Sequence, residues 1–528
     1  MIAAVSSRFT AVAGACLLLF ALTFLNSDIL PLGWPDEALF SAPAAALAER
    51  GVFSTSVLVG LIPGMDTATL WNSPLYMVLT AGPYWLTGES RVVARGVSFV
   101  LACVALAIFF AVNRRLLPEH PRLQALLPLL LACDLTFQRA ANTARMDMLT
   151  LVWFLGAIYF LIRDYQNRTG RTPGAVASGR LDRHAALLPF CAGLCTGAAA
   201  LSHPIAVLLI PVALIWTLPA WRALLWGIAG TLLVFSFWLP YIIEHIQIFC
   251  IQFIAQLVRK KDILSFFGGD TGGVFKVFAA QYGGRGLLMI LAGLMVLIVA
   301  AAGLLQLYRL RRAIFSDLFP RVYLTFAVVF ALVLLSSEAW YPLYVGPVLL
   351  WTAALLWAGS SAATKRFDLT RIALPFAALA LVGGTFVFTI REHFLYKTPA
   401  QVARFEERAL EVARDCRTVY LRVRPDPYFL YRERYPDLEV LEFIPGKLQF
   451  EPGDVPFQCL RDCMTIPGGY SAYLLRRYAT IDCFLLDQHD DWEPLLRDYL
   501  AERSAEFEVE AFPDLPPLDS TRLLRRRP

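Results

Sequence analysis

The chain has 528 residues, of which 57% are hydrophobic and 17% charged, and its mean hydropathy is +0.56. This composition predicts an integral membrane protein and excludes a soluble enzyme. The formal net charge of +5 does not indicate nucleic-acid binding, because the basic residues gather in the loops between apolar segments and thus reflect membrane topology.

Apolar segments recur along most of the chain and are separated by short polar connections. A membrane helix needs roughly 17–25 apolar residues, and several of these segments are at or below the lower end. We expect about eleven membrane helices, at 9–25, 96–112, 123–137, 148–162, 185–201, 205–218, 223–239, 287–307, 322–335, 342–357 and 372–388. The first has no small-residue cleavage site directly after it, so we expect it to be retained.

The basic residues set the orientation of these helices. They are concentrated in alternate loops, which places the N-terminus in the cytoplasm and the loop after the first span outside. The sequence therefore predicts a multi-pass protein of the bacterial inner membrane, with residues 1–391 in the membrane domain and residues 392–528 on the periplasmic side.

Residues 392–528 contain no apolar segment and are rich in charge, which predicts a soluble α/β domain. Strands are expected at 418–423, 439–444, 482–486 and 507–512, and helices at 399–414 and 492–503. No nucleophile elbow, metal motif or glycine fingerprint occurs there, so we assign this domain no catalysis. The basic residues 522–527 are expected to form a frayed end, with contact to anionic headgroups as the alternative.

Four of the ten cysteines, Cys416, Cys459, Cys463 and Cys483, lie in this domain. In an exported domain they predict up to two disulfide bonds. Zinc binding is the weaker alternative, because the spacing of Cys459 and Cys463 is only loosely that of metal ligands.

Two outer loops, 28–90 and 241–285, are too long to be simple turns. The first is expected to contain an amphipathic helix at 38–50 and an interfacial helix at 74–86, with Trp71, Tyr76, Tyr84 and Trp85 at the membrane surface. The second contains the glycine-rich stretch 268–273, which predicts either a mobile lid over a lipid-facing cleft or a flexible connector.

The adjacent acids Asp36 and Glu37 follow the first span directly. A carboxylate at a membrane surface can act as a general base on a hydroxyl group, which indicates chemistry at the bilayer boundary. The alternative is an ordinary helix start, because proline followed by acids is favoured in the first turn.

Other polar residues lie at the ends of spans, where ionisable side chains in a membrane protein point to function. All fall on the predicted outer side: Arg145 and Asp147 before the fourth span, His203 between the fifth and sixth, and Glu338, Tyr341 and Tyr344 at the tenth. Structural roles are the alternative, with Asp147 as a helix cap, Arg145 as a lipid anchor, His203 as a turn residue and the tyrosines at the membrane interface.

Together these segments resemble the GT-C superfamily of glycosyltransferases, in particular the branch with lipid A aminoarabinose transferases and dolichyl-phosphate-mannose protein mannosyltransferases. The resemblance covers roughly residues 9–357 and depends mainly on Asp36-Glu37 and on residues 144–149, with residues 341–347 as a weaker match. It implies an all-α polytopic fold of GT-C type and transfer of a sugar from a polyprenyl-phosphate carrier, with Asp36 as the base.

The chain departs from that family at two places. Asn72 and Ser73 stand where the aminoarabinose transferases have a Glu-Lys pair, and His203 and Pro204 stand where they have Lys-Gly. The missing carboxylate and lysine speak against aminoarabinose as the sugar. We assign no metal ligand and no cofactor, and the need for a divalent metal stays open.

The expected enzyme is an inverting hexosyl- or pentosyltransferase acting on an acceptor hydroxyl of a glycan, lipid or protein. Asp36 would remove the hydroxyl proton, and Glu37 would orient the helix or the acceptor. Arg145 would bind the leaving phosphate with Arg259, Lys260, Lys261 and His203, and Asp147 would hold Arg145. A lipid or solute transporter and a non-catalytic scaffold remain the alternatives.

Overall fold

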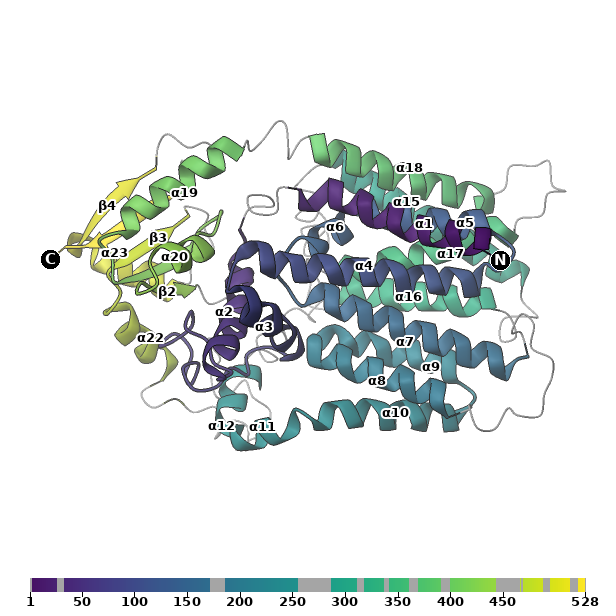
Figure 1. Cartoon of the computed structure of the whole chain (residues 1–528), viewed down its shortest axis with the longest axis horizontal. Helices are drawn as coiled ribbons and strands as arrows, with labels where there is room; N and C mark the ends of the chain where they lie inside the picture. Colours follow the sequence, from purple (N-terminus) through teal and green to yellow (C-terminus); the bar gives the residue numbers. More distant parts are fainter. Residues whose placement is uncertain are drawn as a thin grey trace.

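The structure is a computed structural model that describes residues 2–25, 33–170, 186–254, 286–310, 318–336, 341–359, 369–390, 399–442, 466, 469–487, 494–512 and 521–527. The molecule is elongated, with a bundle of helices at one end and a small sheet with its own helices at the other (Figure 1). Helices α2 and α3 lie between the two parts.

Each of the apolar segments predicted from the sequence falls on helical structure. The helices of the bundle and its short helical turns are α1 (Ile2–Leu19), η1 (Phe20–Phe24), α4 (Arg91–Leu116), α5 (Pro121–Ala132), α6 (Leu135–Ala141), α7 (Asp147–Arg168), α8 (Leu187–Ser202), η2 (Pro204–Leu208), α9 (Leu209–Thr217), α10 (Trp221–Ser236), α15 (Gly286–Arg309), α16 (Leu318–Ser336), η5 (Tyr341–Tyr344), α17 (Val345–Gly359) and α18 (Leu369–Ile390).

In the described part of the chain, five helices are long and apolar enough to cross a membrane, and six apolar helices are shorter. The number of eleven spans therefore stays a prediction. The third predicted segment is not one helix, because Asp134 interrupts it. The Asp134 carboxylate accepts hydrogen bonds from the backbone N–H groups of Thr136 (2.8 Å) and Phe137 (3.0 Å) and so starts α6 as a new helix.

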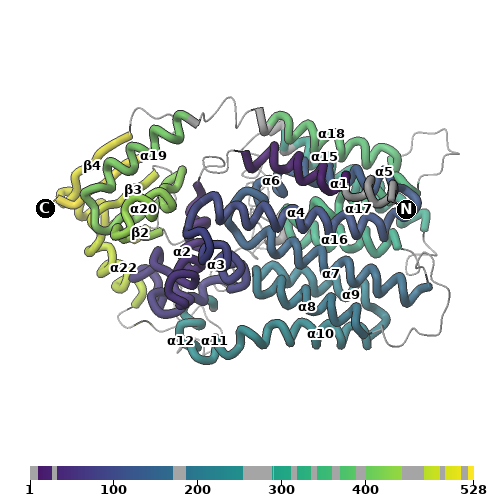
Figure 2. Tube along the Cα trace, viewed as in Figure 1, coloured from purple at the N-terminus to yellow at the C-terminus, as the bar shows by residue number. Residues whose placement is uncertain are grey.

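The bundle helices run side by side, with α10 along one edge and α18 along the opposite one (Figure 2). The closest pair is α8 and α10, where glycines let the backbones touch. A Cβ on Gly193 would lie 2.0 Å from the carbonyl oxygen of Gly227, and one on Gly230 would lie 2.3 Å from that of Phe190. Small residues at such positions are typical of helices that associate in membranes.

The first outer loop is folded more tightly than its sequence predicts. Helix α2 (Pro35–Arg50) is buried on every side from Glu37 to Ala46, so the prediction of an amphipathic helix is wrong. Helix α3 (Leu75–Thr87) forms as expected, but Trp71, Tyr76 and Tyr84 are buried and only Trp85, at 75% exposure, is free to meet lipid. The reason is packing, because α2 lies against α3 and covers it.

The second outer loop begins with α11 (Leu239–Glu244), α12 (Ile246–Phe249) and η3 (Cys250–Ile254). Gln252 ties it to the first loop, because its side chain accepts from the Leu70 N–H (2.6 Å) and donates to the carbonyls of Ala68 and Pro63 (both 3.1 Å). The glycine-rich stretch 268–273 lies outside the described residues, and its two interpretations stay predictions.

The C-terminal domain is built from helices around a five-stranded sheet of order β2-β1-β3-β5-β4. Its elements are α19 (Pro399–Ala413), β1 (Thr418–Arg422), α20 (Tyr428–Arg434), β2 (Glu439–Glu442), α22 (Tyr470–Tyr478), β3 (Cys483–Leu486), α23 (Pro494–Glu502), η8 (Ser504–Glu506), β4 (Phe507–Ala511) and β5 (Arg522–Arg526). Strands β2, β1 and β3 are parallel, and β5 runs antiparallel to β3 and β4.

All four predicted strands and both predicted helices of this domain are present, but the frayed end is wrong. Residues 522–526 form β5, which inserts between β3 and β4. Leu523 is buried in the core, and the Arg526 guanidinium bonds the Glu506 carboxylate (3.0 Å) and the Tyr499 hydroxyl (2.9 Å). The Arg526 side chain therefore fits an internal strand because its charge is paired with the Glu506 carboxylate.

One of the disulfide bonds expected in this domain is present, between Cys416 after α19 and Cys483 in β3. It joins the helix to the middle of the sheet. Cys459 and Cys463 lie outside the described residues, so the second bond stays a prediction.

The C-terminal domain docks on the first outer loop and on the start of α4. Backbone N–H groups of Asp426 and Glu442 donate to the carbonyls of Gly33 (3.0 Å) and Val57 (2.8 Å). Two side chains of the C-terminal domain, the Tyr428 hydroxyl and the Arg432 guanidinium, donate to the Glu89 carboxylate at 2.6 and 3.3 Å. In addition, the Arg91 guanidinium donates to the Glu406 carboxylate (3.0 Å), and the Tyr470 hydroxyl donates to the Leu61 carbonyl (2.8 Å). We call this contact the joint.

Candidate active site

Asp36 lies in the first turn of α2, and its carboxylate pairs with the Arg145 guanidinium from the turn before α7. Nε of Arg145 also donates to Oδ2 of Asp147 at 2.9 Å. Arg145 is thus held between two carboxylates from different elements, and the Asp147 contact expected from the sequence is present. The Asp36 side chain keeps 22% of its surface exposed, whereas that of Asp147 keeps 1%. Asp36 is therefore the carboxylate of this cluster that a substrate can reach.

Glu37 points the other way and connects three elements. Its carboxylate accepts two bonds from Arg95 of α4 (2.8 and 2.7 Å) and one from the backbone N–H of Ala144 (2.9 Å). It also accepts from the Trp34 N–H at 3.1 Å, which closes the first turn of α2. Since Ala144 precedes Arg145, the Glu37 carboxylate fixes the segment that carries Arg145 against the helix that carries Asp36.

The charge of Glu37 is compensated within this clamp. Burial would raise the pKa of the Glu37 carboxyl, but the Arg95 guanidinium and the Ala144 N–H hold it below its usual value. The side chain is buried. Of the two roles expected for Glu37, orientation of the helix fits this geometry, and contact with the acceptor does not, because no acceptor can reach the side chain.

Arg95 and Arg91 are site residues that the sequence analysis does not single out. Each is buried, Arg95 fully, and they lie in the first two turns of α4. Positive charges are disfavoured at a helix N-terminus by the helix dipole. Two arginines spaced i, i+4 at the start of a helix therefore indicate that acidic side chains lie nearby. This spacing can be read from the sequence.

The remaining predicted residues are less tightly connected. Tyr344 is buried, and its hydroxyl donates to the Asp147 carbonyl at 3.4 Å, while Tyr341 begins η5. His203 is buried at the end of α8, where its Nδ1 accepts from the Ile205 N–H at 2.8 Å. This bond supports the structural interpretation of His203. Arg259, Lys260, Lys261 and Glu338 lie outside the described residues, and their roles stay predictions.

The described residues do not form a metal site. No three His, Cys, Asp or Glu side chains among them gather as ligands. Asp36 and Asp147 both direct an oxygen to Arg145, whose positive charge opposes a cation at the same place.

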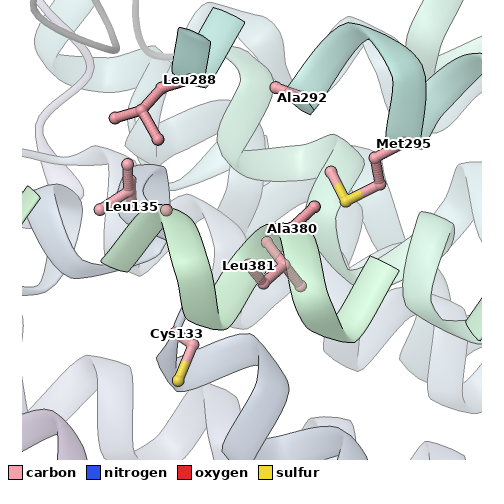
Figure 3. Close-up of a pocket in the computed structure, with 8 residues that line it drawn as sticks. Cys133, Leu135, Leu288, Ala292, Met295, Ala380 and Leu381 are labelled. Atoms are coloured by element: carbon pink, nitrogen blue, oxygen red, sulfur yellow. The ribbon is translucent and has the colours of Figure 1, made fainter. Parts of the chain in front are cut away.

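Two apolar cavities lie apart from the ionic cluster, within the bundle. The first has a volume of about 20 Å³ and is lined by Cys133 and by residues of α6, α15 and α18, including Leu135, Met295 and Leu381 (Figure 3). The second, of about 30 Å³, shares Ala292 and Met295 with it and reaches Asp134. Each cavity is about the size of one water molecule and is too small to hold a sugar.

No protein-family model and no curated protein sequence matches the chain. Solved structures do. ArnT from Cupriavidus metallidurans in the apo state superposes with a TM-score of 0.60 at 15% identity over 99% of this chain and 98% of that one. The same protein bound to undecaprenyl phosphate gives 0.58 at 13% identity, over 98% and 97%.

An archaeal enzyme shares the arrangement over a smaller part of its length. The Archaeoglobus fulgidus oligosaccharyltransferase tethered to an acceptor peptide gives a TM-score of 0.54 at 13% identity, over 91% of this chain and 69% of that one. The chain therefore has the fold of ArnT and of this oligosaccharyltransferase, which confirms the GT-C fold that the sequence resemblance implied.

Proposed function

We propose that the protein is a membrane glycosyltransferase that moves a sugar from a polyprenyl-phosphate carrier to an acceptor hydroxyl, with Asp36 as general base. The observation that carries this proposal is the cluster of Asp36, Arg145 and Asp147, in which an accessible carboxylate shares an arginine with a buried one. ArnT, which has the same fold, was solved with undecaprenyl phosphate bound, and this supports the class of donor.

In the proposed reaction the acceptor oxygen attacks the anomeric carbon of the sugar. Asp36 takes the hydroxyl proton, the bond from the anomeric carbon to the phosphate oxygen breaks, and polyprenyl phosphate leaves with the electron pair. A direct displacement of this kind inverts the anomeric centre. General-base catalysis of this type contributes typically about 10²–10⁴-fold to the rate.

Arg145 is placed to stabilise the phosphate as its charge develops. Its Nε is held by Asp147, so the planar guanidinium is fixed in one orientation while a terminal nitrogen faces Asp36. Guanidinium groups bind phosphate oxygens in this fork geometry more firmly than an ammonium does. In an in-line displacement the attacking oxygen and the leaving phosphate lie on opposite faces of the anomeric carbon, so the sugar would enter between the Asp36 carboxylate and the Arg145 guanidinium.

The cellular setting follows from the loop charges. We place the cluster and the C-terminal domain on the periplasmic face of a bacterial inner membrane, where a lipid-linked sugar is available and cytoplasmic nucleotide sugars are not. The partners are then the polyprenyl-phosphate sugar, membrane lipids and an acceptor glycan, lipid or protein.

The direct test offers the purified protein in lipid a radiolabelled sugar, either on a polyprenyl monophosphate or on a nucleotide, together with candidate acceptors. We expect transfer from the lipid donor and none from the nucleotide. Transfer from the nucleotide alone would overturn the proposal, and no transfer from either donor across several sugars would favour a scaffold.

A variant of Arg145 separates the two roles in the cluster. Arg145→Ala should weaken use of the lipid donor, seen as a raised KM for the donor together with a lower kcat, because the phosphate loses its ligand in both ground and transition states. Asp36→Asn should lower kcat and leave binding of the donor nearly unchanged. Equal effects of both variants on donor binding would contradict this division.

A further inference from the structure

Two acidic side chains are buried inside the joint, away from Asp36. Asp426 lies after β1 and Glu442 ends β2, and the two carboxyl groups interact electrostatically with each other. Asp426 keeps 3% of its surface exposed and Glu442 none. Carboxylates buried to this degree are otherwise paired with a cation or a set of donors.

No such donor is present among the described residues. Oδ1 of Asp426 accepts from the Tyr428 N–H at 2.8 Å, but Oδ2 of Asp426 and both carboxylate oxygens of Glu442 have no donor there. Two ionised carboxylates only accept hydrogen bonds, so they cannot bond to each other. A proton between them removes the conflict, because a protonated carboxyl can donate.

The charges around the pair do not replace this proton. Arg91 of α4 faces Asp426, but its guanidinium already bonds the Asp426 carbonyl (3.2 Å) and the Glu406 carboxylate (3.0 Å). The negative charge of Glu37 in α2 acts unfavourably on Asp426, and Tyr431 of α20 is a neutral neighbour. Leu421 of β1, which lies opposite Glu442 in the sheet, carries no charge.

The pair lies at the two backbone bonds that connect the C-terminal domain to the first outer loop. The N–H of Asp426 donates to Gly33, three residues before Asp36, and that of Glu442 donates to Val57, beyond the end of α2. A Cβ on Gly33 would lie 2.6 Å from the Asp426 carbonyl oxygen, so the two backbones are in direct contact. Any movement of the pair is therefore transmitted to both flanks of α2.

We propose that Asp426 and Glu442 share a proton that holds the C-terminal domain on the first outer loop, and that both are positioning residues for Asp36. Loss of this proton would leave two negative charges in a dry contact and loosen the joint. The consequence for transfer rests on the proposed function, whereas the consequence for docking does not.

The direction of the pH effect follows from the burial of the two groups. Burial raises the pKa of Asp426 to about 6, and burial together with the negative charge of Asp426 raises the pKa of Glu442 well above its usual value. A carboxyl whose pKa is raised by folding stabilises the contact fully below its unfolded pKa, near 4. That stability is lost as the pH rises through the folded pKa values.

The test compares the full-length protein with Glu442→Gln, because glutamine has the shape of a protonated glutamate and keeps a donor at every pH. Hydrogen–deuterium exchange is measured for segments 33–40 and 52–62 at pH 5.5 and pH 8.5, always between variants at the same pH. Glu508→Gln is the matched control, since Glu508 is exposed on β4.

At pH 8.5 we expect both segments of the wild type to exchange about tenfold faster than in Glu442→Gln, which corresponds to one pKa unit of displacement. At pH 5.5 the two proteins should be alike, and the control should follow the wild type throughout. Equal protection of wild type and Glu442→Gln at both pH values would overturn the proposal, as would lower protection of Glu442→Gln at both.

Transfer assays give the second readout. The kcat of the wild type should fall between pH 7 and pH 8.5 more steeply than that of Glu442→Gln, with the KM for the donor little changed. If exchange behaves as expected while kcat does not, the shared proton stands and its link to Asp36 fails. If no donor is used by any variant, the proposed function fails and the exchange result is unaffected.

Discussion

At the scale of single residues, the two neighbouring acids of α2 have opposite environments. Asp36 is partly exposed and shares Arg145 with Asp147, whereas Glu37 is buried and bonded to Arg95, Ala144 and Trp34. A helix turns by about 100° per residue, so adjacent side chains leave it in different directions. One acid is thereby available for chemistry and the other holds the structure around it.

Asp36→Asn should lower transfer by at least about 10²-fold, since the amide keeps the shape of the carboxylate but cannot take a proton. Its melting temperature should stay within a few degrees of the wild type, because Arg145 retains Asp147 as a partner. Initial rates and thermal unfolding in detergent measure both effects. Asp66→Asn, in the same loop and exposed, is the control. Turnover above about a tenth of wild type would contradict the base role.

Glu37→Gln should act mainly on stability. It removes the charge that compensates the fully buried Arg95, and breaking a buried ion pair costs about 3–5 kcal/mol. We expect a clearly lower melting temperature and a lower yield of folded protein, with Glu49→Gln on the exposed end of the same helix as the control. An unchanged melting temperature would show that the clamp does not hold α2.

At the scale of elements, close backbone contacts decide which helices lie together. Gly193 and Gly230 let α8 and α10 approach until a carbonyl of one helix lies where a Cβ of the other would be. Thr231 of α10 adds a bond to the Gly193 carbonyl at 3.1 Å. In lipid such packing replaces the hydrophobic effect as the force between helices, because lipid tails are as apolar as the side chains.

Gly193→Ala should therefore separate α8 from α10 and destabilise the protein by about 1–3 kcal/mol, the usual range for overpacking. Gly82→Ala is the matched control, because a Cβ there meets nothing within 4 Å. It should be neutral or slightly stabilising, since alanine favours a helix over glycine. Thermal unfolding of both variants in the same lipid measures the difference, and equal melting temperatures would refute the role of this contact.

At the scale of the whole molecule, the orientation of the chain is the prediction on which the proposed site depends. The loop charges predict a cytoplasmic N-terminus and a C-terminal domain on the outer side. Alkaline phosphatase fused after Pro528 should be active, and fused after Arg171 it should be inactive. The reverse pattern would place Asp36 on the face where no polyprenyl-linked sugar is presented.

Oxidation of the C-terminal domain is an independent check on that orientation. Mass spectrometry of unreduced protein from native membranes should find the Cys416–Cys483 bond, and we expect a second bond between Cys459 and Cys463. The reduced and alkylated protein is the control. Four thiols that react without reductant would contradict export of the domain.

The sequence by itself determined the helical segments and most of the C-terminal sheet. Helices and strands of this kind are predicted from the length and the periodicity of apolar residues, which can be read from residues close together in the sequence. The four predicted strands follow from this pattern, whereas Asp36 and Arg145 are indicated by their positions at the ends of spans. The resemblance to GT-C enzymes was carried by the same short stretches.

Only the tertiary structure decided what covers each element and which charges meet. Helix α2 is buried from Glu37 to Ala46 because α3 and the C-terminal domain pack around it, and residues 522–526 form β5 because they pair with both β3 and β4. The pairs Glu37–Arg95 and Asp426–Glu442 join residues far apart in the chain. A single sequence records the charge of each residue and its local surroundings, but a buried pair is set by the approach of distant segments, and that approach depends on the packing of the whole molecule.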